Sequence, residues 1–426
     1  MSRYSLSRNF AWALAANVGH ALAQWGMLVT LAKFGSASMV GEYALAIAIT
    51  TPVILFANLQ LREVQATDSG SDRTFADYLG LRTITTGIAV VAIVLYAFAG
   101  ASSAHLAATI ALVGIAKCVE SLCDVFHGLY QRYERMDSVT RSLLVKGVLA
   151  LGAWCLGLSL TGAVLGGVAG VLVAALITLA FVDRRSALQI EPGRRILPRY
   201  ERAKLGALFR AVWPLGASTC LLSITTNIPR YFIGASHGAA ALGIFAGMAY
   251  LMTAGTMLMM ALSQSASPRL ARLLAAGEHE AAAHLLRSQL ALAGLLGASG
   301  VVGAALFGRP LLALIYTPEF ATETRAFVWV MVAAGVGYLN TVFAYSLTAA
   351  REMRVQLTIE VSAAVVTLAG SALLVPIYGL EGAGGAVLAG AVARLATQAL
   401  RLRSAWSVRG ASATRVPMPL GAERTA

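Results

Sequence analysis

The sequence is poor in charged residues, and this scarcity excludes an ordinary soluble protein. Only 12% of its 426 residues are Asp, Glu, Lys or Arg, whereas 58% are hydrophobic, and the mean hydropathy is +0.72. Soluble domains average about 25% charged and about 45–50% apolar residues. The composition therefore predicts a polytopic, all-α membrane protein.

Cysteine is also scarce, and its distribution excludes a metal-ligand cluster. The four cysteines lie in apolar segments without close metal-ligand spacing, so we expect free, buried thiols. The chain also has no Asp-x-Asp motif and no glycine loop of the kind that holds phosphate. We therefore expect no metal and no cofactor. The cysteines are Cys118, Cys123, Cys155 and Cys220.

Apolar runs of the length of a membrane helix, about 20 residues, recur along the whole chain. The first, from Phe10 to Ala32, is longer than a signal-peptide core of about 7–15 residues, so we interpret it as a membrane span. Two runs are too long for one crossing and divide at "LTGA" (160–163) and "GASHG" (234–238). We predict about twelve spans: 10–33, 40–61, 79–101, 104–129, 140–160, 163–182, 208–234, 238–264, 285–307, 325–349, 356–376 and 380–401.

The net charge of +13 is spread over alternate connections between these spans. With the N-terminus inside, 27 of the 33 Lys and Arg residues fall in cytoplasmic segments and their flanks. The positive-inside rule thus predicts that both termini are cytoplasmic. Anionic phospholipid is a simpler partner for these charges than nucleic acid. The remaining bases are Lys33, Arg309 and Arg325 outside, and Lys117, Arg230 and Arg394 within the membrane.

The most basic connection divides the chain into two similar groups of six spans. We predict an N-terminal six-helix bundle (1–183), a cytoplasmic linker (184–205), a C-terminal six-helix bundle (206–403) and a disordered cytoplasmic tail (404–426). The halves match at an offset of 217 residues, as in Gly162 with Gly379. Six spans per half give parallel repeats, as in transporters whose site lies between two lobes.

Polar residues form stripes on the first span of each half. Helical periodicity places each stripe on one face, and we expect the two faces to line a water-accessible cleft between the halves. The alternative is hydrogen bonding between helices, worth about 0.6 kcal/mol each. The stripes are Asn17, His20 and Gln24 in the first span, and Thr219, Ser223, Asn227 and Arg230 in the seventh.

The segment "TNIPRYFIG" (226–234) places an arginine where a lipid-facing helix is apolar. An arginine in a membrane helix costs about 2.5–3.5 kcal/mol on insertion scales, and Pro229 leaves the carbonyl of Thr225 without its helical partner. The planar fork of Arg230 suits a phosphate, because it binds two oxygens at once. The alternative for Arg230, and for Arg394, is snorkelling to headgroups.

The fourth span carries a second charged cluster. Lys117, Glu120 and Asp124 share one helix face, where they could neutralise one another in part and leave one excess negative charge. A carboxylate held in an apolar setting is suited to ion coupling in a carrier. A purely structural ladder of ion pairs stays open as the alternative.

Four segments resemble the Wzx-like oligosaccharide flippases of bacterial polysaccharide synthesis. They are "NLQLREVQATD" (58–68), "FHGLYQRYERMDSV" (126–139), "TNIPRYFIG" (226–234) and "YSLTAAREMRVQ" (345–356). That family belongs to the multidrug/oligosaccharidyl-lipid/polysaccharide exporter superfamily. The resemblance implies two six-helix bundles that form a V, with the first, second, seventh and eighth spans around the cavity.

The resemblance also implies a function, which is not an enzymatic one. It predicts a flippase of the bacterial cytoplasmic (inner) membrane for undecaprenyl-diphosphate-linked oligosaccharides of O-antigen, capsule or exopolysaccharide. It also suggests a polysaccharide polymerase and a chain-length regulator as partners. Arg230 would bind the diphosphate, whereas Asn17, His20, Gln24 and Asn227 would contact the glycan. Lys117, Glu120 and Asp124 would be the candidates for ion coupling. The alternatives are a cation-coupled multidrug antiporter of the same fold and, less favoured because the outer connections are short, a glycan polymerase or glycosyltransferase.

Overall fold

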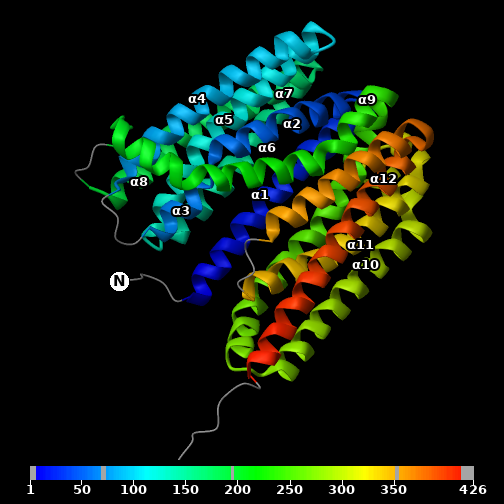
Figure 1. The fold of residues 1–426 in the computed structure, drawn as a ribbon. Coiled ribbons are helices and arrows are strands. Elements are labelled where there is room, and N and C mark those ends of the chain that lie inside the picture. The colour runs from blue at the N-terminus through cyan, green and yellow to red at the C-terminus, as the bar shows by residue number, and fades with distance from the viewer. Residues whose placement is uncertain (1–5, 69–72, 193–195, 351–354, 414–426) are drawn as a thin grey trace, which may run out of the picture. The chain divides into compact units, whose positions relative to one another are not determined.

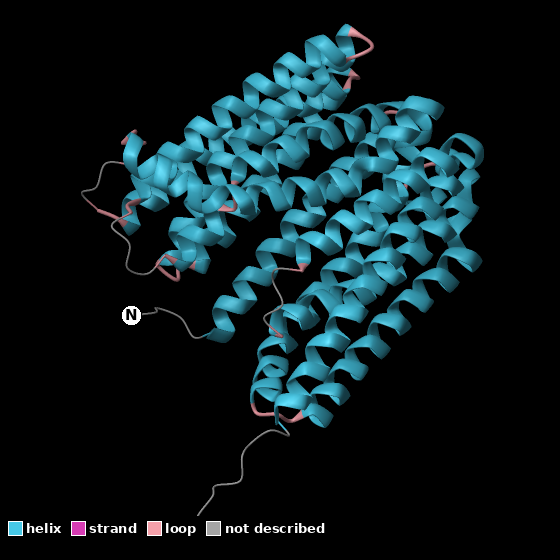
Figure 2. Ribbon diagram, in the orientation of Figure 1, coloured by secondary structure: helices cyan, strands magenta, loops and turns pink. Residues whose placement is uncertain are grey.

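The computed structural model describes residues 6–68, 73–192, 196–350 and 355–413, and over these ranges it contains helices and no strands (Figures 1 and 2). The all-α class predicted for the chain is thereby confirmed. The helices are α1 (Leu6–Phe34), α2 (Ala37–Asn58), α3 (Leu61–Thr67), α4 (Phe75–Gly100), α5 (Ala104–Arg132), α6 (Met136–Thr161), α7 (Val164–Ile177), the π-helix η1 (Thr178–Asp183), α8 (Arg184–Ile190), α9 (Arg202–Ala275), α10 (His279–Ile315), the 3-10 helix η2 (Pro318–Glu323), α11 (Thr324–Ala349) and α12 (Gln356–Ala413).

The predicted divisions between spans fall at glycines with positive φ. Gly162, with φ 64°, follows the end of α6, and Gly238, with φ 79°, interrupts the helix of α9. Gly379, with φ 56°, does the same within α12. Glycine tolerates this conformation because it has no Cβ. The matched glycines 162 and 379 thus share a positive φ, which supports the repeat.

The helices provide the predicted crossings of the membrane. Within the described ranges, nine helices are long and apolar enough to span it. Two of these, α9 and α12, each contain two helices joined at a glycine, and the 29-residue α1 covers the first predicted span. The protein is therefore a multi-pass membrane protein with spans close to those predicted.

Two compact units make up the chain. The first comprises Met1–Gly247 and Pro310–Thr322, and the second comprises Met248–Arg309 and Glu323–Ala426. These limits differ from the predicted bundles, because residues 206–247 belong with the first unit; the division into two six-helix bundles stays a prediction. Helix α12 continues to Ala413, so residues 404–413 of the predicted disordered tail are helical, and residues 414–426 lie outside the described ranges.

Helix α5 is the centre of the first unit. It packs against α2, α3, α4 and α7, and Figure 1 shows α4, α5 and α7 side by side. At its C-terminal end, Phe126, Leu129 and Tyr130 join a hydrophobic core with residues of α3, α4, α6, α8 and α9. Helices α6 and α7 pack closely at glycines, because a Cβ on Gly166 would lie 2.4 Å from the carbonyl oxygen of Gly157.

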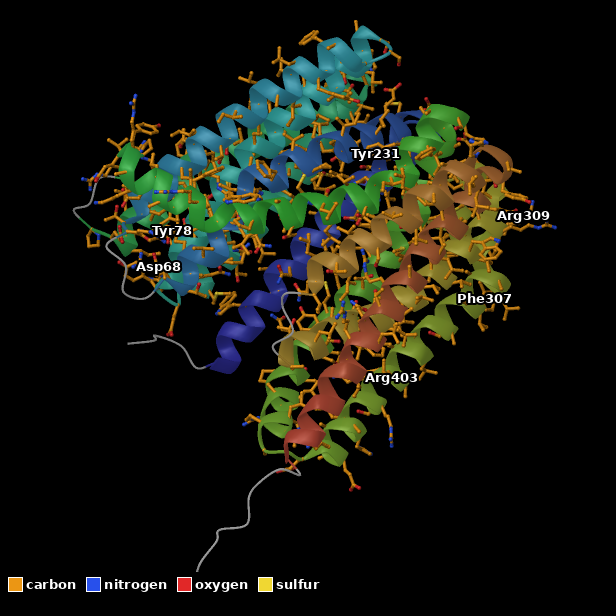
Figure 3. All side chains as sticks on the ribbon, in the orientation of Figure 1. Asp68, Tyr78, Tyr231, Phe307, Arg309 and Arg403 are labelled. Carbon is orange, nitrogen blue, oxygen red and sulfur yellow. The ribbon has the colours of Figure 1, made fainter. Side chains whose placement is uncertain are left out.

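The part of α9 before Gly238 packs antiparallel along α2. The hydroxyl of Thr219 lies 3.4 Å from the carbonyl oxygen of Leu55, and the hydroxyl of Tyr231 donates to the carbonyl oxygen of Ala48 at 2.5 Å. Figure 3 labels Tyr231 on this part of α9. Further along, a Cβ on Gly41 would clash with the backbone of Ala239. The helix that carries Arg230 is therefore fixed to α2 along its length.

The second unit is built on α10, α11 and α12. Helices α11 and α12 pack closely against each other, and the Cβ that Gly297 of α10 lacks would lie 2.7 Å from the Cα of Gly335 on α11. The hydroxyl of Tyr338 on α11 donates to the carbonyl oxygen of Met252 at 3.3 Å, which connects the later part of α9 to this unit.

Candidate functional site

Arg230 lies on the side of α9 that carries the predicted polar stripe. Its Nη1 donates to Oδ1 of Asn227 at 2.7 Å, and Nδ2 of Asn227 donates to the carbonyl oxygen of Ser223 at 2.9 Å. The stripe is thus a hydrogen-bonded ladder that holds the guanidinium in place. Asn227 is 4% exposed, so its side chain supports Arg230 in this structure.

The guanidinium of Arg230 has no carboxylate partner. No Asp or Glu of the described ranges lies within ion-pair distance of it, and its buried Nε has no hydrogen-bond partner. Arginine has five N–H donors, and the ladder uses one of them. The remaining donors can therefore bind the oxygens of an anion.

The stripe of α1 lies in the same unit. Nε2 of His20 and Nε2 of Gln24 are 3.0 Å apart, whereas Nδ1 of His20 is buried without a partner in the described part of the chain. Asn17 is exposed. His20 also interacts electrostatically with Lys117 and Glu120 of α5, so the stripe of α1 reaches the charged cluster.

The charged cluster of α5 divides into two ion-pair groups. Nζ of Lys117 is 2.9 Å from Oε2 of Glu120. Asp124 pairs instead with two arginines, its Oδ1 3.2 Å from Arg62 and its Oδ2 3.4 Å from Arg82. The predicted excess negative charge is therefore wrong, because arginines from α3 and α4 neutralise Asp124.

Arg82 is a buried charged residue of this network that the sequence alone did not identify. The positive-inside rule assigns Arg82 to a cytoplasmic flank, but its side chain is 0% exposed within α4. Its Nη1 donates to Asn58 Oδ1 and to Ser121 Oγ, while Arg62 also donates to Gln131 Oε1 at 3.2 Å. The segments 58–68 and 126–139, which carry the family resemblance, therefore meet around α5.

A second buried polar group lies beside this network. Nε2 of His127 is 2.9 Å from Ser142 Oγ, and its two ring nitrogens each lie 4.0 Å from a carboxylate oxygen, one of Asp124 and one of Asp183. Lys146 of α6, 5% exposed, acts electrostatically on Asp183 and on Glu120. The charge pattern assigns Lys146 to a cytoplasmic flank, whereas the structure buries both Lys146 and Asp183.

The second unit contains one more intramembrane arginine. Nη2 of Arg394 is 2.6 Å from Oε2 of Glu360, and the two side chains are 23% and 24% exposed. Both residues lie on α12, on either side of Gly379. Snorkelling is therefore not needed to explain Arg394, because Glu360 neutralises it.

The cysteines and acidic residues form no metal site among the described residues. The four cysteines are free, as predicted; Cys118 and Cys123 are buried, whereas Cys155 and Cys220 are only half-buried. No group of three His, Cys, Asp or Glu residues in these ranges is arranged to hold a metal ion. The chemistry of the site is therefore that of charged and hydrogen-bonding side chains.

Comparison with known families shows to which family the chain belongs. Residues 6–274 match the family described as "Polysaccharide biosynthesis protein", which is more than half of the sequence. The chain belongs to this family. A curated relative, the capsular polysaccharide biosynthesis protein CapF of Staphylococcus aureus, is 26% identical over 385 residues, covering 88% of this chain and 94% of the relative.

Solved structures share the fold at low sequence identity. A multidrug resistance MATE family transporter of the MOP superfamily superposes with a TM-score of 0.73 at 12% identity, covering 93% of this chain and 96% of that one. The lipid II flippase MurJ gives 0.70 at 10% identity, covering 96% and 94%. The chain is thus a member of a polysaccharide biosynthesis family, and its fold is shared with membrane transporters.

Proposed function

We propose that this protein flips undecaprenyl-diphosphate-linked oligosaccharides across the bacterial cytoplasmic membrane by alternating access. Membership of the polysaccharide biosynthesis family supports a role in glycan export. The name of the relative CapF favours a capsular product, and the likeness to the flippase MurJ favours a lipid-linked substrate.

The observation that carries this proposal is the unpaired guanidinium of Arg230. Lys117, Arg82 and Arg394 each have a carboxylate within ion-pair distance, whereas Arg230 has none among the described residues. A buried cation without a counterion is costly, and the diphosphate of a lipid-linked glycan supplies a counterion with oxygens for both arms of the fork.

The other candidate residues take supporting roles in this proposal. Asn227 positions Arg230 through their hydrogen bond of 2.7 Å. Asn17 is exposed and Gln24 and His20 are half-buried on α1, so their amide and imidazole groups are the candidates for glycan contact.

The ion pairs of α5 are the candidates for ion coupling. The pair of Lys117 and Glu120 interacts with His20 of α1, so a change in its charge acts on the stripe that we assign to the glycan. Asp124 is held by two arginines and is better suited to fix α3 and α4 against α5. Glu120 is therefore our first candidate for coupling within this cluster.

A cation-coupled multidrug antiporter is the second candidate. Structures of MATE transporters share the fold, and a membrane carboxylate for a cationic drug is available in Glu120. The pairing of Glu120 with Lys117 at 2.9 Å counts against this role, since the carboxylate is already neutralised.

The deciding experiment measures undecaprenyl-linked oligosaccharide in the inner leaflet of cells with and without the gene. A flippase predicts accumulation of the lipid-linked glycan on deletion, loss of surface glycan, and rescue by the wild-type gene. Unchanged lipid-linked glycan together with altered drug tolerance would instead favour the antiporter. A deletion strain complemented with Trp213→Phe, a change at an exposed position of α9, serves as the expression-matched control.

A further inference from the structure

The carboxyl group of Asp183 is the most deeply buried acid that the proposed mechanism does not use. Its side chain is 0% exposed, and Oδ2 has no hydrogen-bond partner in the described residues. The hydroxyl of Tyr130 donates to the carbonyl oxygen of Asp183 at 2.7 Å and reaches Oδ1 at 3.4 Å. One carboxyl oxygen is therefore partly satisfied and the other is not.

The backbone at Asp183 is itself unusual. Residues Thr178–Asp183 form a π-helix that links α7 to α8. π-Helical turns are rare and occur frequently at functional sites. This turn directs the final residue, Asp183, toward α5 and α6, where it meets His127 and Tyr130.

The groups around the carboxyl come from two neighbouring helices. Helix α5 contributes Cys123, His127 and Tyr130, and α6 contributes Ser142 and Lys146. Nε2 of His127 lies 4.0 Å from Oδ1 but bonds Ser142 at 2.9 Å, and its other ring nitrogen faces Asp124. Within the described ranges, no Lys or Arg nitrogen lies within ion-pair distance of Asp183, so Lys146 acts on it only from farther away.

We propose that Asp183 is a proton-binding site of this transporter. A hydronium ion at the end of α7 that is predicted to be cytoplasmic transfers one proton to the carboxylate. Its O–H bond breaks and leaves water, an O–H bond forms at Oδ2, and the anion becomes the neutral acid. An unpaired carboxylate is costly to bury, whereas the neutral acid is much less so. The proton thus supplies what no side chain of the described residues supplies to Oδ2.

Lys146 connects this site to the candidate coupling pair. It interacts with Asp183 and with Glu120, and it also acts on His20 of α1. When Asp183 is neutral, Lys146 loses one of the two carboxylates on which it acts, so its interaction with Glu120 gains in relative weight. Protonation of Asp183 in this way affects the polar stripe of α1. This link to the stripe rests on the proposed function, whereas the binding of a proton by Asp183 does not.

The test is infrared difference spectroscopy of the purified full-length protein in lipid, titrated from acidic to alkaline pH. Because all 20 Asp and Glu residues contribute to such spectra, the spectra of the wild type and of the variants are subtracted from one another. The wild type is expected to contain one C=O stretch of a protonated carboxylic acid, disappearing as the pH rises, that belongs to Asp183. Asp183→Asn, which keeps the shape of the neutral acid, is expected to lose that band. Asp137→Asn, which removes a carboxylate paired with Arg135 at 2.9 Å, is the matched control and is expected to keep it.

The proposal is overturned if the titrating C=O bands of Asp183→Asn are the same as those of the wild type. It is also overturned if the wild type has no such band. If Asp183→Asn does not accumulate in the membrane, Asp183→Glu replaces it, and the band must then shift in frequency. Flipping of lipid-linked glycan is measured separately in the same vesicles. Loss of its pH dependence in Asp183→Asn supports the link to transport, whereas absent flipping in the wild type contradicts the proposed function and leaves the infrared result standing.

Discussion

Arg82 and Arg230 both lie in helices of the first unit, Arg82 buried and Arg230 half-buried, and their surroundings differ. Arg82 is surrounded by acceptors from three other positions: Asn58, Ser121 and the carboxylate of Asp124. Arg230 has one acceptor, the amide oxygen of Asn227 on its own helix. Within the described residues, the charge of Arg82 is thus neutralised by a carboxylate and that of Arg230 is not, although the Nε of each lacks a hydrogen-bond partner.

The difference assigns different tasks to the two arginines. A buried cation that is neutralised by a carboxylate stabilises the arrangement of the helices that supply its partners, because removing one partner leaves the others uncompensated. A buried cation with few partners adds little to stability and gains most from an external anion. The burial of an arginine in a membrane helix therefore does not by itself identify a binding site; the pairing of its charge does.

The largest expected effect is on the stability of the region around Arg82. Asp124→Asn removes the carboxylate from Arg62 and Arg82, and we expect the free energy of unfolding to fall by about 3 kcal/mol, at the lower end of the range for a broken buried ion pair because Asp124 is 30% exposed. Unfolding of the purified protein in mixed micelles with increasing denaturing detergent measures it. Glu134→Gln, at an exposed position just after α5, is the control, and equal stability of both variants would contradict the structural role of Asp124.

The next effect concerns transport rather than stability. Arg230→Gln keeps a long polar side chain but removes the charge and the fork, and we expect flipping to fall about 100-fold, equivalent to about 2.7 kcal/mol or one to two hydrogen bonds to a charged group. The free energy of unfolding is expected to stay the same or rise, since an unpaired charge is removed. Flipping is measured in vesicles at matched protein content.

Arg230→Lys sharpens this result. A lysine keeps the charge but has no planar fork, so we expect its transport to lie between those of the wild type and Arg230→Gln. Wild-type transport in Arg230→Gln would reduce Arg230 to a headgroup anchor.

The pattern of apolar runs was enough to predict the class of fold and most helix boundaries. The splits near Gly162 and Gly238 followed from length alone, because no single crossing accommodates the runs that contain them. The extent of the second bundle did not follow in the same way. The compact units depend on which helices pack together, and the packing of α9 on α2 involves residues about 160–200 positions apart in the chain.

The candidate site could be predicted only where its residues share one helix. Asn227 and Arg230, three positions apart, lie together as the periodicity predicts. The partners of Asp124 come from α3 and α4, and those of Asp183 from α5 and α6, which no spacing within one helix reveals. Arg82 and Lys146 were assigned to the cytoplasmic flanks because both lie near the end of a span, where exposure is the usual outcome.

Arg394 provides an intermediate case for the comparison. It has a carboxylate partner in Glu360, but both side chains are about one-quarter exposed. We expect a coupling free energy of about 1–2 kcal/mol, above that of a surface pair and below that of a fully buried one. A double-mutant cycle with Arg394→Met and Glu360→Gln, followed by unfolding in mixed micelles, measures it.

The outcome of this cycle separates two views of Arg394. Additive effects of the two substitutions would mean that the ion pair contributes nothing and that Arg394 is available to an external partner. Transport is expected to be reduced less by Arg394→Met than by Arg230→Gln, because the guanidinium of Arg394 is already neutralised.

The smallest expected effect is that of Asn227→Ala, which tests the positioning of Arg230. The substitution removes one hydrogen bond to a charged group and the bond to the carbonyl oxygen of Ser223. Because the charge and the fork of Arg230 remain, we expect flipping to fall about 5-fold, equivalent to about 1 kcal/mol. The apparent affinity for the lipid-linked substrate should account for most of this change. Thr226→Ala, at an exposed position that bonds only within its own helix, is the matched control on α9. A loss as large as that of Arg230→Gln would place Asn227 in direct contact with the substrate, since the loss of a positioning bond alone leaves the anion its principal partner.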